Sequence, residues 1–138
     1  MTRRVRDDVA LNKIATIDRC LRRIGEEYQG APERLEDPTI QDSIVLNLQR
    51  ACEAAIDLAM HVVAERRLGL PQDARSAFDL LHGDGIIDAD LARRLKAMVG
   101  FRNIAIHDYQ QLHIGILRHI LDERLGDFRD YIARVLDG

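Results

Sequence analysis

The sequence predicts an all-α protein, built as an up-and-down bundle of four to five antiparallel helices. Apolar residues recur every three or four positions through most of the chain, and no stretch alternates for long enough to form a strand. Short connections between the helical segments place sequential helices antiparallel. The length of 138 residues suits one domain, and no repeat or low-complexity tract divides it. Residues 1–138 are therefore expected to form a single helical domain.

Two long helices are expected in the first half of the chain. The first has its apolar seam at positions 14, 17, 21, 24 and 28, and it ends before Gly30 and Pro32. The second begins at Asp37 and Pro38, an N-cap carboxylate followed by proline at the first helical position, and continues to about Leu68. This second helix is long for so small a domain, so we expect it to be the spine against which the others pack.

Three further helices are expected in the second half. A short one spans roughly 73–82 and ends in the turn at 83–85. The fourth begins after an N-cap at Asp88 and runs to about His107, and the fifth carries an apolar stripe over 117–135. Gly126 lies inside this last pattern and weakens the helix by about 1 kcal/mol relative to alanine. The fifth helix can therefore bend at that position.

The composition narrows the function. The chain carries 20 Lys and Arg against 23 Asp and Glu, a net charge of −3. This balance argues against a protein that covers nucleic acid or a membrane over a wide surface, but it leaves room for a small basic site. No secretory signal and no apolar run of membrane-spanning length is present. Cys20 and Cys52 have neither disulfide nor zinc spacing, so we expect a cytoplasmic protein with both thiols in its core.

One segment at the end of the fourth helix concentrates polar chemistry. Residues 102–109 hold a guanidinium, an amide, an imidazole, a carboxylate and a phenol. At about 100° per residue, Asn103 and His107 share a helix face, whereas Arg102 and His107 lie about 140° apart. One straight helix does not bring the latter two together, although a groove closed by a second copy of the helix can. The alternative interpretation is structural: Arg102 stabilises the negative end of the helix and Tyr109 is a core aromatic.

The pattern of Arg102, Asn103, His107 and Tyr109 resembles the RX4HXY motif of HepT-type toxins in the HEPN superfamily. The resemblance extends to the long second helix and to the step from residues 102–109 into the last helix. It implies a HEPN-like fold and a homodimeric endoribonuclease that needs no metal or other cofactor, with two motif copies facing each other. On this hypothesis His107 transfers protons and Arg102 binds the scissile phosphate. Asn103 orients the side chain of either His107 or Arg102.

The resemblance also implies a protein partner. HepT-type toxins are encoded beside a small nucleotidyltransferase antitoxin of the MNT type, which transfers AMP from ATP to the motif tyrosine, here Tyr109. Two other functions stay open at this point. One is a non-catalytic nucleotide- or substrate-binding subunit for a partner nucleotidyltransferase, and the other is a helical oligomerisation module. The intact pair of Arg102 and His107 favours the enzyme.

Three acidic or imidazole groups are candidate supports for the site. Asp57 lies in an otherwise apolar stretch with His61 one turn later, and Asp108 lies inside the motif. A buried Asp57 would need a partner, which His61 or Arg102 would supply. The alternative, which we favour, is that Asp57 is an ordinary, partly exposed helix acid.

A short basic run precedes the motif on the same helix. Arg93, Arg94 and Lys96, together with Arg102, place four cations within ten residues. Such a run is commonly a solvated face. On the helix that bears the motif it can equally bind an RNA backbone. The sequence does not decide between these two interpretations.

Overall fold

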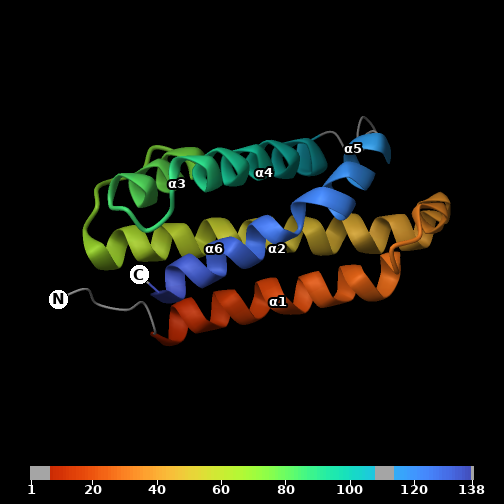
Figure 1. Cartoon of the computed structure of the whole chain (residues 1–138), viewed down its shortest axis with the longest axis horizontal. Helices are drawn as coiled ribbons and strands as arrows, with labels where there is room; N and C mark the ends of the chain where they lie inside the picture. The colour runs from red at the N-terminus through yellow and green to blue at the C-terminus, as the bar shows by residue number, and fades with distance from the viewer. Residues whose placement is uncertain (1–6, 108–113, 138) are drawn as a thin grey trace.

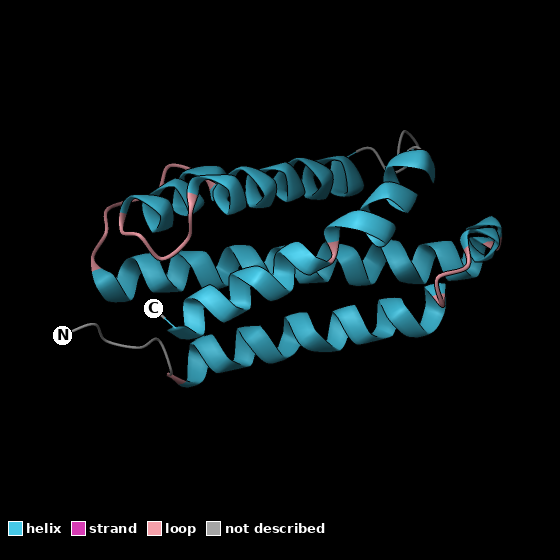
Figure 2. Ribbon diagram, in the orientation of Figure 1, coloured by secondary structure: helices cyan, strands magenta, loops and turns pink. Residues whose placement is uncertain are grey.

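A computed structural model describes residues 7–107 and 114–137, and in these residues all regular structure is helical (Figure 1). The predicted all-α bundle is confirmed, and Figure 2 shows helices joined by short loops. The elements are α1 (Asp8–Tyr28), the 3-10 turn η1 (Pro32–Glu36), α2 (Pro38–Arg66), α3 (Ala74–Gly83), α4 (Ala89–His107), α5 (Ile114–His119), the π turn η3 (Ile120–Arg124) and α6 (Gly126–Asp137).

The long helix α2 is the spine of the bundle, as its length predicts. It packs against α1, α3 and α4, and α1, α2, α4 and α6 lie roughly along the long axis of the molecule in alternating directions (Figure 1). The buried hydroxyl of Tyr131 on α6 donates a hydrogen bond of 2.9 Å to the backbone oxygen of Ala55 on α2. The Tyr131 ring also meets Phe78 of α3 edge to face, with centroids 5.6 Å apart. One core therefore joins the helices that carry the site to the rest of the domain.

Side-chain caps explain where the helices begin. Asp37 accepts hydrogen bonds from the backbone N–H groups of the first turn of α2, and Asp88 accepts one from Leu91 at the start of α4, as predicted. Asp73 caps α3 in a reciprocal pair with Ser76. These local contacts fix the residues at which α2 and α4 begin, and these two helices meet at the candidate site.

The core is apolar and holds both cysteines. Cys20 and Cys52 are buried and unpaired, and burial raises the pKa of the Cys52 thiol to about 12. A protonated buried thiol is a poor nucleophile, in agreement with the predicted core role. None of the helices in the described ranges combines the length and apolar character needed to cross a membrane.

The last predicted helix is divided into three pieces. Where the apolar stripe predicts one helix from 117 to 135, the chain forms α5, the π turn η3 and α6, which begins at Gly126. The interruption ends directly before Gly126, the predicted weak point. Asp122 in the π turn accepts a hydrogen bond of 2.6 Å from the hydroxyl of Tyr28 on α1, so a tertiary contact holds the altered turn in place. Apolar spacing does not reveal it, because the stripe on either side keeps helical periodicity.

Asp7 stabilises the start of α1, and its removal tests this contact. The Ala10 backbone N–H and the His61 ring hydrogen-bond its carboxylate and lower its pKa. We expect Asp7→Ala to reduce the free energy of unfolding by about 1 kcal/mol, while Asp7→Asn keeps the cap and loses only the charge. Urea unfolding at a series of pH values measures both changes.

The pH dependence follows from the direction of that shift. Because the folded pKa of Asp7 lies below its unfolded value, its contribution is complete above about pH 4 and is lost as the pH falls through the folded pKa. The stability difference between the wild type and Asp7→Asn should therefore shrink at acid pH. A difference that stays constant from pH 7 to pH 3 would show that the carboxylate charge contributes nothing.

Candidate active site

Arg102 is held on α4 by an acidic residue of α2. Its Nη1 lies 2.9 Å from Oε1 of Glu53, and both side chains are partly buried. Its Nε atom is buried and has no hydrogen-bond partner among the described residues. The guanidinium is thus oriented by one carboxylate and keeps unused donor capacity, which suits a group that binds an anion.

Glu53 is a site residue that the sequence reasoning missed. It stands in the same stretch of α2 as Asp57, one helical turn earlier. An acid at that spacing in an apolar segment was the available signal, but the sequence does not show which turn of α2 faces Arg102. The ion pair between Glu53 and Arg102 shows that the turn of α2 at Glu53 faces Arg102.

The other motif residues are placed by the course of α4. This helix continues through His107, so Arg102, Asn103 and His107 share one helical backbone, as predicted. Arg102 and His107 therefore stand about 140° apart around the axis. Asp108 and Tyr109 lie outside the described residues. Their roles stay predictions.

The candidate supports Asp57 and His61 do not pair with each other. Asp57 has 51% of its side chain exposed and lies 3.2 Å from Nζ of Lys13, whereas Nε2 of His61 lies 2.8 Å from the carboxylate of Asp7. Both partners come from α1 or its cap, because α1 runs alongside this part of α2. The less favoured interpretation, a buried Asp57 paired with His61 or Arg102, is thus wrong, and the structure agrees with the favoured one of a partly exposed acid.

The basic run before the motif is divided among acidic partners. Arg93 pairs with Asp90, and Arg94 pairs with Asp90 at 3.0 Å and with Asp127 and Asp130 of α6. Lys96 points to α3, where its Nζ lies 2.8 Å from Asp79. The three cations therefore do not form one free basic face, and Lys96 faces away from the other two.

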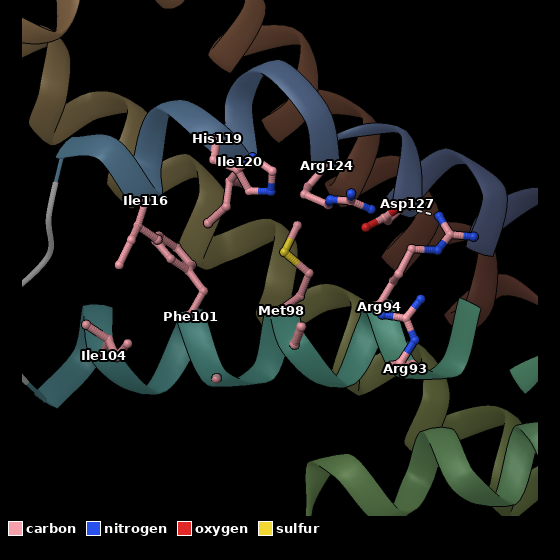
Figure 3. A pocket seen from close by; sticks show the side chains of 12 residues that line it. Arg93, Arg94, Met98, Phe101, Ile104, Ile116, His119, Ile120, Arg124 and Asp127 are labelled. Atoms are coloured by element: carbon pink, nitrogen blue, oxygen red, sulfur yellow. Dashed lines mark hydrogen bonds and ion pairs between the residues drawn. The ribbon is translucent and has the colours of Figure 1, made fainter. Parts of the chain in front are cut away.

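A groove of about 570 Å³ runs between α4 and the segment from α5 to α6 (Figure 3). Arg93 and Arg94 lie at one end and Ile104 and Ile116 at the other, with Met98 between them (Figure 3). The lining residues are Arg93, Arg94, Ala97, Met98, Gly100, Phe101, Ile104, Ile116, His119, Ile120, Arg124 and Asp127. Sequence reasoning identified neither His119 nor Arg124, because both reach the groove through the π turn.

Comparisons with known proteins agree on one family. The family model described as "Ribonuclease HepT-like" matches residues 17–135. The chain is 47% identical over 126 residues to an mRNA nuclease HepT of Shewanella oneidensis, covering 91% of this chain and 95% of that protein.

Solved structures show the same likeness. A tri-AMPylated HEPN toxin of Shewanella oneidensis, in complex with an MNT antitoxin, superimposes with a TM-score of 0.91 at 45% identity, covering 96% of this chain and all of that one. A toxin–antitoxin structure with AMP-PNP superimposes with a TM-score of 0.89 at 44% identity, with the same coverage.

Proposed function

This chain belongs to the HepT-like ribonuclease family, and on that premise we propose that it is a metal-independent endoribonuclease, the toxin of an MNT–HEPN toxin–antitoxin pair. The observation that carries the proposal is the environment of Arg102. Its guanidinium is fixed by Glu53 and keeps a buried, unpartnered Nε on the same helix as His107. The relative named an mRNA nuclease supports RNA as the substrate.

The proposed chemistry uses the nucleophile that RNA itself carries. The 2′-OH attacks the adjacent phosphorus, the bond to the 5′-oxygen breaks, and a cyclic phosphate and a free 5′-OH result. A base must take the 2′-OH proton and an acid must give one to the leaving oxygen, which His107 imidazoles can do near neutral pH. Arg102 binds the phosphate oxygens and stabilises the charge that develops on them. Asn103 orients one of these groups.

A homodimer completes the proposed site. Since positions 102 and 107 are separated by about 140° around the axis of a regular α-helix, we do not expect one copy of α4 to bring both residues to the same phosphate. A second copy of α4 facing the first would supply the missing group. Two His107 side chains could then divide the roles of base and acid.

Cleavage by the purified protein tests the proposal. We expect RNA cleavage in the presence of EDTA, with fragments that end in a cyclic phosphate and begin with a free 5′-OH. Cleavage that EDTA abolishes would contradict the metal-independent mechanism. Growth arrest on expression, lost in Arg102→Ala, separates the enzyme from a non-catalytic subunit, for which the substitution would not matter.

Tyr109 is the proposed acceptor of AMP from the partner nucleotidyltransferase. The tri-AMPylated toxin among the similar structures supports this assignment. Each AMP adds negative charge and bulk beside the site where the RNA phosphate must lie. With the partner, ATP and Mg²⁺, we expect the intact mass to rise in AMP-sized steps, and Tyr109→Phe to abolish them. Tyr28→Phe is the control, and equal modification of Tyr109→Phe would show that the acceptor lies elsewhere.

A further inference from the structure

The groove beside α4 combines an apolar floor with a polar end. Met98, Phe101 and Ile120 are buried at its base. Ile104 and Ile116 line it while exposing 41% and 43% of their surface. A floor with an aromatic ring and a thioether suits a flat ring system. The groove therefore offers an apolar ligand group a place next to the helix that carries Arg102.

Two side chains of this groove, His119 and Arg124, have no ion-pair partner among the described residues. His119 directly precedes the π turn and Arg124 is its last residue (Figure 3). The i→i+5 repeat of a π-helix brings residues five positions apart onto one face, whereas an α-helix would separate them by about 140°. The π turn thus directs both side chains into the groove, where they can bind an anion.

Asp127 adds a hydrogen-bond acceptor. Only 3% of this residue is exposed, and Arg94 holds one oxygen of its carboxylate. The other oxygen, Oδ2, has no hydrogen-bond partner among the described residues, although Asp127 lines the groove (Figure 3). A buried acceptor without a partner is costly, and a ligand N–H group would satisfy it.

We propose that this groove binds a nucleotide of the RNA strand that flanks the scissile phosphate. The base lies on the floor of Met98 and Phe101, a base N–H group faces Asp127, and the phosphate lies at Arg124 and His119. A nucleotide is the ligand class that unites a flat ring, N–H donors and an anion. Met98 precedes Arg102 by one helical turn, about 6 Å along the axis, which is short enough for one RNA strand to reach both. This inference rests on the proposed ribonuclease function.

Binding is measured separately from cleavage. The probe is a fluorescent 2′-O-methyl oligoribonucleotide, which lacks the nucleophile, and its anisotropy is followed with the full-length protein over a range of salt concentrations. We expect Arg124→Gln to weaken binding about tenfold and to reduce the slope of log K against log salt by about 0.7, the value for one lost phosphate contact to a single strand. Arg129→Gln on α6 lies outside the groove and should leave both quantities unchanged.

A second pair of variants tests the apolar end. Ile116→Glu places a negative charge in the groove and should weaken binding at least tenfold. Ile114→Glu, on the same helix at 47% exposure and outside the lining, should not. Equal binding by Arg124→Gln and Arg129→Gln overturns the proposal. So does loss of binding in Ile116→Glu that coincides with dissociation of a dimer, which would make the groove a contact between copies.

Two further outcomes separate this inference from the ribonuclease itself. Competition by free AMP at the oligonucleotide's own affinity would identify a mononucleotide site and overturn the assignment to an RNA strand. If the wild type cleaves RNA but the Arg124 and Ile116 variants bind and cleave normally, the groove proposal fails and the ribonuclease stands. If Arg124-dependent binding is found without any cleavage, the ribonuclease fails while the groove is supported.

Discussion

The variant His107→Ala should cleave RNA about 10²–10⁴-fold more slowly than the wild type, the usual contribution of a positioned acid or base. His107 is in the last turn of α4, at the edge of the described part of the bundle, so the substitution should leave the fold intact. Initial cleavage rates give the loss, and circular dichroism checks the helix content. His82→Ala, at the exposed end of α3, is the matched control. Parent-rate cleavage by His107→Ala would remove this residue from the mechanism.

Mixed dimers show whether each site uses both His107 side chains. Co-expression of wild-type and His107→Ala chains in equal amounts leaves roughly a quarter of randomly paired dimers with two wild-type copies. If one imidazole is the base and the partner's is the acid, the activity falls to about a quarter. If each copy's His107 serves only its own site, about one half remains. The second outcome contradicts a site that divides the two roles across the dimer.

Loss of Arg94 should reduce the free energy of unfolding by about 3 kcal/mol, because it leaves the Asp127 carboxylate buried without its cation. Urea unfolding of Arg94→Ala at a fixed protein concentration measures the change. Arg93→Ala is the matched control, since that neighbouring side chain is 72% exposed and pairs with Asp90 at the surface. The control should change stability by less than about 0.5 kcal/mol.

A double variant shows whether the lost stability comes from the unpaired Asp127 charge or from the loss of the Arg94 side chain itself. Arg94→Met combined with Asp127→Leu removes both charges and retains apolar volume, so we expect most of the lost stability to return. If Arg94→Ala and Arg93→Ala reduce the free energy of unfolding equally, the buried ion pair of Arg94 with Asp127 stabilises the fold no more than a surface ion pair does. The same double variant should weaken RNA binding in the groove, because it removes both the acceptor on Asp127 and the cation of Arg94 from the lining.

The sequence by itself determined the first four long helical segments and the position of the motif. Apolar spacing and the caps Asp37 and Asp88 are local signals, since each depends on residues within one or two turns. They predicted the starts of α2 and α4, the long spine and the extension of α4 through His107. The resemblance carried by Arg102 and His107 was equally readable, because it depends only on residue types at set intervals.

Only the tertiary structure decided which charged groups meet. With 23 acids for 20 Lys and Arg, any cation has many candidate partners, and the rotation and neighbours of each helix select among them. Helix packing pairs Arg102 with Glu53, and it pairs Asp57 and His61 with residues of α1 and its cap. Within the basic run of α4, Lys96 pairs with α3 and Arg94 pairs with α6. The π turn likewise depends on a contact with Tyr28 from the far end of the sequence. The groove depends on such long-range packing as well, because its two walls, α4 and the segment from α5 to α6, are joined by the pair of Arg94 with Asp127.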